Sequence, residues 1–253
     1  MSQNIYDDRA FFEGYSQLRR SRLGLPGAPE WPAVRTLLPP LTGLRVLDLG
    51  CGFGWFCRWA REAGAASVLG VDLSENMLER ARAATEDAGV SYVRADLQDL
   101  ALPEAGFDLV YSSLALHYVE DLAKVLGAVR AALGGGGRLV FSIEHPVYMA
   151  PTRPRWIKTE DGRRIWPLDG YGREGARTTD WLAPGVVKHH RTLGTTLNLL
   201  IDHGFAIRRV EEWRPTVDQV AADPALAEEL ERPMFLLVAA DLVSPGVADA
   251  ARG

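Results

Sequence analysis

The segment from about residue 44 to residue 144 constrains the fold more than any other part of this chain. Short apolar or β-branched runs alternate there with stretches of helical periodicity. Most of the runs are apolar throughout, as strands buried on both faces of a sheet are. They are predicted strands at residues 44–49, 67–71, 91–94, 107–112 and 137–143. Such alternation is typical of βαβ units, so we predict an α/β fold built on a parallel sheet.

The ends of two intervening helices support this interpretation. One helix is predicted to begin after Ser74, a good N-cap residue, and Arg80 and Arg82 lie near its end, where positive charge suits the helix dipole. Another is predicted over residues 120–133, because its apolar residues recur at helical spacing until the glycine run 134–137 stops it. Both helices fit between the predicted strands.

The segments outside this core are less regular. A helix is predicted at residues 10–22, and a hairpin near 155–167 within a stretch rich in Pro, Gly, Trp and Arg. A helix is predicted next, at 191–203. Two strands follow it, at 205–213 and 233–242, with an acidic helical stretch between them. The predicted parts are therefore a helical N-terminal part at 1–40, the core at 41–144, an insertion at 145–190, a C-terminal part of the core sheet at 191–242 and a loose tail at 243–253.

Composition limits the classes of function. Of 253 residues, 47% are hydrophobic and 24% charged, which is average for a folded globular protein. The 28 Lys and Arg against 33 Asp and Glu give a formal charge of −5, which does not favour nucleic acid as a partner. The apolar run 234–240 is far shorter than the roughly 20 residues of a membrane span. The first residues lack the features of a signal peptide, so we expect a cytoplasmic protein without a membrane partner.

A glycine-rich turn follows the first predicted strand at residues 46–55. Glycine lets the main chain approach a ligand closely, and the helix that follows offers unpaired N–H groups. Similar turns bind dinucleotides, but the GxGxG form and Asp48 before the first glycine favour a ligand with a cationic ammonium group. A plain strand-to-helix turn with a capping aspartate is the alternative. Cys51 and Cys57 lack the spacing of a metal or redox motif, so no metal is expected.

Two further acids follow predicted strands. Asp72 ends the second strand about twenty residues beyond the glycine turn, where a carboxylate can accept both hydroxyls of a ribose. Asp96 follows the third strand and could accept from an adenine amine, with the Leu97 backbone and the apolar Met77 beside the ring. Each acid alone would more often be a turn residue. Three acids at the ends of consecutive parallel strands indicate a ligand site, because such sheets bind ligands at that edge.

These motifs together resemble those of class I S-adenosylmethionine-dependent methyltransferases, in the small-molecule branch. The resemblance rests on residues 46–54, 71–74, 95–97 and 107–113 and covers about residues 40–145. It implies a doubly wound, seven-stranded, mostly parallel Rossmann-like sheet, here with an insertion after the fifth strand. It also implies S-adenosylmethionine as cofactor and S-adenosylhomocysteine as product.

The resemblance assigns cofactor contacts to particular residues. The methionine end would meet the turn and the carbonyl of Ser112 at the end of the fourth strand, and the nucleoside would meet the acids after the second and third strands. The N-terminal helix would be a lid, with Tyr15 and Arg19 near the methionine carboxylate; the alternative is a packing helix with surface Tyr and Arg. The predicted cofactor-binding residues are Tyr15, Arg19, Asp48, Gly50, Cys51, Gly52, Asp72, Leu73, Met77, Asp96, Leu97 and Ser112.

The expected reaction is in-line displacement at the sulfonium methyl group, which requires alignment more than covalent help. A base is needed only if the acceptor is protonated. The candidates are His117, after the fourth strand, and His145, after the fifth, and for each a structural or solvent-facing histidine is the alternative. His189 and His190 are predicted to open the helix after the insertion and could reach the same pocket.

Absent motifs narrow the acceptor. The chain lacks the Asn/Asp-Pro-Pro-Tyr/Phe sequence expected for nucleobase amino methylation and a Pro-Cys nucleophile. We therefore expect methylation of a small molecule at oxygen, nitrogen or carbon, by a monomer or homodimer. The alternatives are a nicotinamide-dependent oxidoreductase and a protein that binds the cofactor without transferring methyl.

The charge is uneven along the chain. Residues 145–191 hold nine Lys and Arg and five Asp and Glu, a net charge of +4. One hypothesis is that this basic, Trp-bearing cover favours an anionic or aromatic acceptor, and a solvated loop is the alternative.

Overall fold

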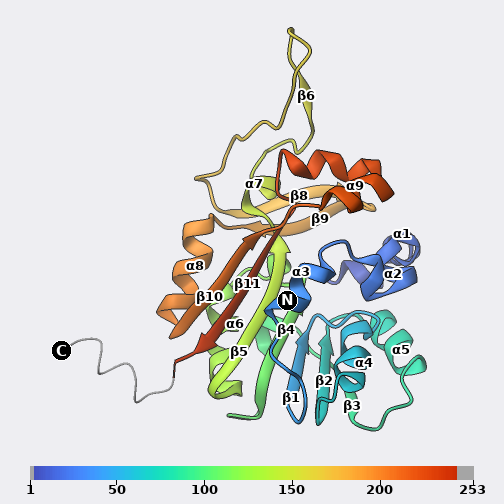
Figure 1. The fold of residues 1–253 in the computed structure, drawn as a ribbon, viewed down its shortest axis with the longest axis vertical. Helices are drawn as coiled ribbons and strands as arrows, with labels where there is room; N and C mark the ends of the chain where they lie inside the picture. The colour runs from blue at the N-terminus through green and yellow to red at the C-terminus, as the bar shows by residue number, and fades with distance from the viewer. Residues whose placement is uncertain (1–2, 244–253) are drawn as a thin grey trace, which may run out of the picture.

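The computed structural model describes residues 3–243, so most of the predicted tail at 243–253 lies outside the described residues. Its centre is a seven-stranded sheet with the order β10-β11-β5-β4-β1-β2-β3 (Figure 1). The strands are β1 Arg45–Leu49, β2 Ser67–Asp72, β3 Val90–Arg94, β4 Phe107–Ser113, β5 Leu133–Glu144, β10 Phe205–Glu212 and β11 Phe235–Leu242. Pairing is parallel from β3 through β5, while β11 runs antiparallel to both β5 and β10. The predicted seven-stranded, mostly parallel sheet is confirmed.

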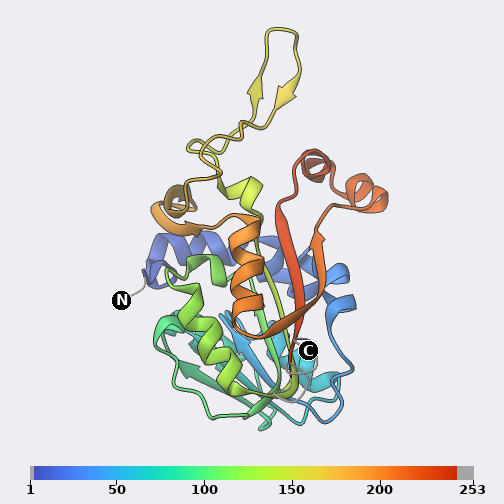
Figure 2. The ribbon, with the colours of Figure 1, turned by 90° about the vertical axis from the view of Figure 1, so that its left-hand side faces the viewer.

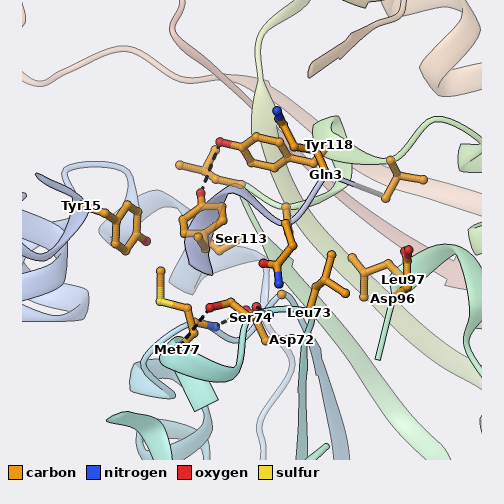
Figure 3. A pocket seen from close by; sticks show the side chains of 17 residues that line it. Gln3, Tyr15, Asp72, Leu73, Ser74, Met77, Asp96, Leu97, Ser113 and Tyr118 are labelled. Atoms are coloured by element: carbon orange, nitrogen blue, oxygen red, sulfur yellow. Dashed lines mark hydrogen bonds between the residues drawn. The ribbon is translucent and has the colours of Figure 1, made fainter. Parts of the chain in front are cut away.

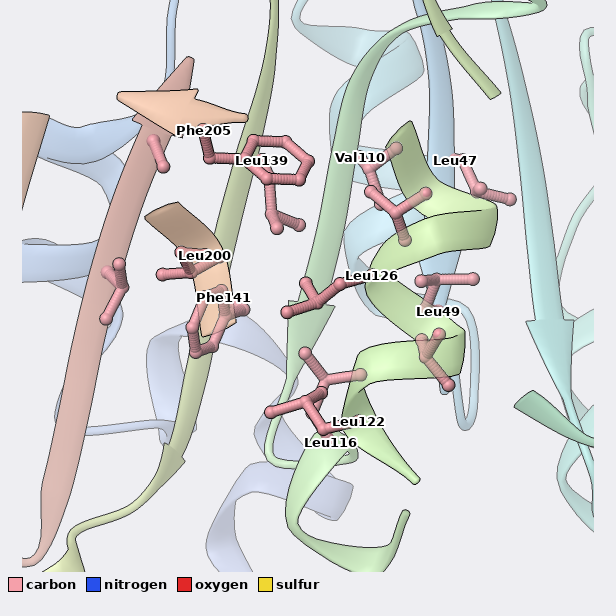
Figure 4. Packing of buried hydrophobic residues seen from close by; sticks show 14 of the residues in the cluster. Leu47, Leu49, Val110, Leu116, Leu122, Leu126, Leu139, Phe141, Leu200 and Phe205 are labelled. Atoms are coloured by element: carbon pink, nitrogen blue, oxygen red, sulfur yellow. The ribbon is translucent and has the colours of Figure 1, made fainter. Parts of the chain in front are cut away.

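Helices cover both faces of the sheet, as the apolar strands require. On one face lie α6 Leu122–Ala132 and α8 Leu193–Asp202, which stand in front of the sheet in Figure 2. On the other lie α3 Trp31–Leu37, α4 Trp55–Glu62 and α5 Glu75–Ala83. Along β5, Leu139 and Phe141 pack towards α6 and α8 (Figure 4), while Val140 between them packs on the opposite face. The period-two alternation thus places apolar side chains in two cores.

Side-chain caps begin the helices that the sequence predicted. The Ser74 hydroxyl accepts from the Met77 N–H at 3.2 Å at the start of α5. The Asp121 carboxylate accepts from the Lys124 N–H at 2.9 Å and begins α6. These caps satisfy backbone donors that have no partner within the helix.

The N-terminal part differs from its prediction, because the single helix expected at 10–22 is broken. Leu18 has an extended backbone with ψ 147°, so the chain turns between two helices. The elements of this part are η1 Ile5–Asp7, α1 Arg9–Gln17, α2 Arg19–Leu23 and η2 Leu25–Gly27, followed by α3. Figure 1 shows α1 and α2 beyond one end of β1–β3, so they are placed to cover that edge of the sheet.

The insertion contains two hairpins. The predicted one is β6 Ile157–Lys158 with β7 Arg164–Ile165, which projects from the rest of the molecule (Figures 1 and 2). The second, β8 Gly175–Trp181 with β9 Ala183–His190, was not predicted. His189 and His190 therefore end a strand, and the prediction that they open a helix is wrong. The strand was missed because its buried alternate positions, from residue 186 to residue 190, include a lysine and a histidine.

Five short helical elements remain in the part of the chain that the structure describes. They are η3 Leu97–Asp99, η4 Leu116–Tyr118, α7 Pro146–Met149, α9 Val217–Ala222 and η5 Pro224–Leu230. The guanidinium of Arg232 lies 4.0 Å from the ring centre of Trp166 and 4.4 Å from that of Tyr148. This stacking joins the chain after η5 to the insertion.

Within residues 3–243, no helix has the length and apolar character to cross a membrane.

Candidate functional site

A cavity of about 110 Å³ opens at the carboxyl ends of β1, β2 and β4 (Figure 3); we call it the cofactor cavity. Parallel sheets bind ligands at this edge, where turns diverge from neighbouring strands. Most of the predicted cofactor contacts line it, although they come from widely separated segments. Those residues are Tyr15, Gly50, Gly52, Asp72, Leu73, Met77, Asp96 and Leu97.

Asp72 occupies a central place in this cavity. Its Oδ2 accepts from the Gly52 N–H at 2.8 Å, and its Oδ1 accepts from the Ser74 N–H at 2.9 Å. The Leu73 backbone also interacts with this carboxylate, and because a carboxylate has about four acceptor sites, it can still accept from a ligand hydroxyl. Burial raises the pKa of Asp72, and the backbone hydrogen bonds oppose that shift.

The glycines of the turn have conformations that other residues rarely adopt. Gly50 has φ +76° and Gly52 has φ +53°. A Cβ added to Gly50 would lie 2.3 Å from the Cβ of Ala115, whereas one added to Gly52 would meet no atom within 4 Å. Gly50 is therefore required by packing inside the protein, while Gly52 leaves its backbone open to a ligand.

Asp48 and Cys51 line a second cavity of about 100 Å³, which shares Tyr15, Gly50 and Gly52 with the cofactor cavity. The Asp48 side chain is 2% exposed, and its Oδ2 accepts from the Cys57 thiol at 3.2 Å. Burial raises the pKa of Asp48 to about 7. A cationic group in this cavity would favour the charged carboxylate, so the location suits the predicted ammonium contact.

Asp96 and Ser112 were both predicted at strand ends, but only Asp96 lines one of the cavities described here. Asp96 lines the cofactor cavity, and its Oδ1 also accepts from the Gln98 N–H at 3.0 Å. Ser112 is fully buried, with its hydroxyl donating to the Leu49 carbonyl at 2.7 Å, and it lines none of the cavities described here. The residue that faces both the cofactor cavity and the Asp48 cavity is Ser113. Ser113 thus lies at the position next to the predicted Ser112 on β4 and lines both cavities.

The two neighbouring arginines after the first N-terminal helix differ in the cavities that they line. Arg19 is exposed and does not line the cofactor cavity. Its neighbour Arg20 lines the Asp48 cavity together with Tyr15. Arg20 is held there by Glu30, whose two oxygens accept from its Nη2 at 2.9 and 3.0 Å. The break at Leu18 divides the helix that was predicted to be continuous, and Arg20 rather than the predicted Arg19 lines the Asp48 cavity.

A larger cavity of about 470 Å³ adjoins the cofactor cavity, and we call it the acceptor cavity. Four residues, Tyr6, Tyr15, Leu114 and Tyr118, line both. The hydroxyls of Tyr6 and Tyr118 lie 3.2 Å apart between them (Figure 3). The aromatic side chains that line the acceptor cavity are Tyr6, Tyr15, Trp31, Tyr118, Tyr148, Trp181 and Phe235.

The two histidines predicted as bases are engaged inside the protein. The backbone N–H of Glu144 donates to Nδ1 of His117 at 3.3 Å, and burial lowers the pKa of His117 well below its usual value. A neutral ring that accepts at Nδ1 carries its proton on Nε2, so no lone pair is free. His117 does line the acceptor cavity, where it can donate but is not poised to take a proton.

His145 has a structural position. Its Nδ1 accepts from the Val147 N–H at 3.1 Å and caps α7, while its Nε2 lies 2.9 Å from Oε1 of Glu212. The ring is 1% exposed and does not line the acceptor cavity. The structure therefore argues against the prediction that His145 is a base, because both ring nitrogens already have partners.

An ion pair that the sequence analysis missed borders the acceptor cavity. Oε1 of Glu144, the last residue of β5, lies 2.5 Å from Nζ of Lys188 on β9. Lys188 is 3% exposed, and its ammonium lies 4.9 Å from the ring centre of Trp181. Glu144 itself lines the cavity. Glu144 is an acid at the end of the fifth strand, just as Asp72 is an acid at the end of the second. The same sequence signal could therefore have predicted Glu144 as a site residue.

The insertion supplies rings, rather than positive charge, to the acceptor cavity. Of residues 145–190, Tyr148 and Trp181 line it, and no Lys or Arg of that segment is among its lining residues. The arginines with assigned contacts point to protein partners: Arg163 pairs with Asp161, and Arg177 donates to backbone carbonyls. The structure thus does not support the basic-cover hypothesis for an anionic acceptor.

Within the described residues, no cluster of three or more His, Cys, Asp or Glu could hold a metal ion.

Several residues that line the cofactor cavity had no signal in the sequence. Gln3, Asn4 and Tyr6 come from the N-terminus, and Leu114 and Ala115 follow β4. Gln3 donates to the Gly185 carbonyl at 2.8 Å and accepts from the Val187 N–H at 2.9 Å, which ties the N-terminus to β9. These contacts link segments more than 180 residues apart, so no local pattern records them.

Comparisons with known proteins agree with this geometry. Residues 47–141 match a family described as a methyltransferase domain. The crystal structure of an S-adenosylmethionine-dependent methyltransferase from Mesorhizobium loti is 65% identical, covers 86% of this chain and all of its own, and superimposes with a TM-score of 0.84. An uncharacterized protein of Haemophilus influenzae is 37% identical over 217 residues, 83% of this chain and 85% of its own length.

A malonyl-[acyl-carrier protein] O-methyltransferase from Pectobacterium atrosepticum is 38% identical over 128 residues, which is 51% of this chain and 49% of that protein. The aligned region is thus about half the length of this relative. The identity and coverage of the Mesorhizobium loti structure, together with the shared sheet topology, decide the family. The chain belongs to the class I S-adenosylmethionine-dependent methyltransferases, enzymes that take S-adenosylmethionine as their cofactor.

Proposed function

We propose that this protein transfers the methyl group of S-adenosylmethionine to an oxygen, nitrogen or carbon atom of a small molecule held in the acceptor cavity. The observation that carries the proposal is the shared wall: Tyr6, Tyr15, Leu114 and Tyr118 line both cavities. A donor in one cavity and an acceptor in the other would therefore meet at these residues. A cytoplasmic location and a monomer or homodimer are part of the same proposal.

The residues of the smaller cavities fit the cofactor. The backbone at Gly52 is open where a Cβ would point, and the Asp72 carboxylate keeps acceptor capacity for a ribose hydroxyl. Leu73, Met77 and Leu97 add apolar surface for a nucleoside. Asp96 would accept from the adenine amine.

The other end of the cofactor would meet charged groups. Asp48 would hold the ammonium group, with the carbonyl of Ser113 in place of the predicted Ser112, and Tyr15 and Arg20 would lie near the carboxylate. When bound, the cofactor supplies a methyl group that is already electrophilic. The contribution of this chain is to align the two reactants and to exclude water, and the aromatic wall serves both purposes.

The relatives support oxygen as one acceptor atom. Those that match over 38% to 49% of their length include proteins named malonyl-[acyl-carrier protein] O-methyltransferase. Nitrogen and carbon acceptors stay within the proposal, because the contacts that distinguish them lie in the acceptor cavity.

Two measurements test the proposal in order. Isothermal titration with S-adenosylhomocysteine should give a micromolar or tighter dissociation constant, which is about −8 kcal/mol or lower. Incubation with S-adenosylmethionine and a panel of small alcohols, phenols, amines and carbon acids should then give a product heavier by one methylene unit. Titration heat with nicotinamide nucleotides alone would overturn the cofactor assignment. A methyl group found only on added protein or nucleic acid would overturn the small-molecule part.

A further inference from the structure

We propose that Glu144 selects the acceptor, and that its carboxylate takes a hydrogen bond from a neutral hydroxyl or an amine on a flat, apolar, aromatic molecule. This inference rests on the proposed function and specifies the acceptor of that site. It departs from the anionic acceptor that the charge of the insertion alone suggested.

The position of Glu144 is the first argument. It ends β5 beside the acceptor cavity, and its backbone N–H donates to Nδ1 of His117 at 3.3 Å, which holds the strand end in place. Its charge acts on Tyr118, which lines both cavities, and contributes to raising the pKa of that phenol. Glu144 is therefore close to the junction where an acceptor would approach the methyl group.

Lys188 is the second argument, because it compensates the charge of Glu144 without offering its own to a ligand. The residue is 3% exposed, and its ammonium pairs with Oε1 of Glu144 and lies 4.9 Å from the Trp181 ring centre and 5.9 Å from that of Tyr118. It is not a lining residue of the acceptor cavity. The pair thus presents to the cavity a carboxylate, which can only accept hydrogen bonds.

Two of the other charged groups that line this cavity have assigned contacts. Arg20 is held by both oxygens of Glu30. Asp223 accepts from the Ala225 N–H at 3.2 Å and caps η5. Arg19 is exposed. An anionic acceptor would bring a second negative charge towards Glu144 in a largely apolar site, whereas a hydroxyl or amine would satisfy its remaining lone pairs.

The aromatic walls are the third argument, and they define the body of the acceptor. Tyr6, Tyr148, Trp181 and Phe235 surround a cavity of about 470 Å³. Rings pack favourably on flat ligands, and a carboxylate beside ring faces also suits an amine cation. The shared chemistry is an aromatic body with one hydrogen-bond donor.

Binding of matched probes to the protein saturated with S-adenosylhomocysteine tests this inference by calorimetry. The probes are 2-phenylethanol, 2-phenylethylamine and 3-phenylpropionate, which share a ring and differ in the terminal group. We expect the alcohol and the amine to bind at least about tenfold more tightly than the carboxylate, a difference of about 1.4 kcal/mol. The variant Glu144→Gln should reverse this order, because it leaves the ammonium of Lys188 unpaired.

Two further variants act as controls. Glu104→Gln removes an exposed carboxylate remote from both cavities and should leave the order unchanged. The double variant Glu144→Gln, Lys188→Met leaves no buried charge unpaired, so it should fold even if the single variant does not. It should bind the three probes with affinities that differ by less than about threefold.

The outcomes separate this inference from the proposed function. Failure of the wild-type protein to bind S-adenosylhomocysteine would overturn the proposed function and this inference with it. Normal S-adenosylhomocysteine binding together with tightest binding of 3-phenylpropionate, an order unchanged by Glu144→Gln, or no binding of any probe at millimolar concentration would overturn the inference alone.

Discussion

The backbone N–H of Gly52 donates to Oδ2 of Asp72 at 2.8 Å, so the glycine turn after β1 is tied to the acid that ends β2. The same carboxylate accepts from the Ser74 N–H, which positions the start of α5. One side chain thus organises two of the segments that surround the cofactor cavity. Its remaining lone pairs face the space where we place the ribose.

Replacing Asp72 should therefore weaken cofactor binding. We expect Asp72→Ala to lose about 1.5–3 kcal/mol of S-adenosylhomocysteine affinity, the range for hydrogen bonds to a charged group. Calorimetric titration measures this directly. Asp99→Ala, which removes a 70% exposed carboxylate paired with Lys124, is the matched control and should bind normally. Equal affinities for the two variants would contradict the ribose assignment.

Asp48 should make stability depend on pH. Burial raises its pKa to about 7 in the folded protein, compared with about 3.9 in an unfolded chain. The folded state therefore holds the proton over a range in which the unfolded state has lost it, so the free energy of unfolding falls as pH rises from about 4 to about 7 and is level above that range.

Asp48→Asn should remove this dependence, because the amide stays neutral. Relative to wild type, the variant should gain about 2–3 kcal/mol between pH 5 and pH 8, at 1.36 kcal/mol per pKa unit. Urea unfolding at several pH values measures the difference. A wild-type minus variant difference that is constant with pH would show that Asp48 is ionised in the folded protein throughout.

Replacing either glycine of the turn with alanine should affect a different property of the protein, stability for Gly50 and cofactor binding for Gly52. Gly50→Ala would place a Cβ 2.3 Å from that of Ala115, so we expect a loss of stability of several kcal/mol, on the scale of overpacking plus backbone strain. Gly52→Ala has open space and should lose only about 1–2 kcal/mol of stability. Its Cβ would occupy the ligand side, so its cofactor affinity should fall more than its stability. Thermal unfolding and calorimetric titration of both variants measure stability and cofactor affinity. If the turn were purely structural, the cofactor affinity of Gly52→Ala would fall no more than its stability.

Arg232 should hold the insertion against the chain after η5. Its Nη2 donates to Oε1 of Glu229 at 2.6 Å, and both side chains are 5% exposed. Arg232→Met leaves the Glu229 charge buried and unpaired, so we expect a loss of about 3–5 kcal/mol in the free energy of unfolding. Limited proteolysis should also cleave the insertion faster, because the stacking on Trp166 is lost.

The double variant Arg232→Met, Glu229→Gln tests the cause of that loss. It removes both charges and should be appreciably more stable than the single variant. Equal unfolding free energies for the single and double variants would show that the stacking on the rings, rather than the ion pair, stabilises this region.

Much of the cofactor cavity could be predicted, because its signals are local. Asp72 and Asp96 each follow an apolar strand, and the glycines stand in one short turn. The edge at which parallel strands end brings such residues together in any fold of this class. At two predicted positions, Ser112 and Arg19, it is the next residue along the chain that lines the Asp48 cavity. A strand end or a helix break that moves by one position turns a different side chain towards the cavity.

The histidine predictions show a different limit. His117 and His145 follow strands just as Asp72 does, but a sequence does not reveal which ring lone pairs are already used. The Glu144 N–H and the Val147 N–H take up those of Nδ1. These donors become known only when the chain after β5 is placed in space.

The sequence by itself determined the sheet, the glycine turn and the acids at the strand ends, since hydrophobic periodicity and turn chemistry act between residues close in the chain. The tertiary structure alone decided the acceptor cavity. Its walls join Tyr6 near one end of the chain to Phe235 near the other, and the partner of Glu144 is Lys188, 44 residues away on a hairpin that the sequence pattern concealed. Contacts between such distant segments depend on how the elements pack, and that packing leaves no local pattern in the sequence.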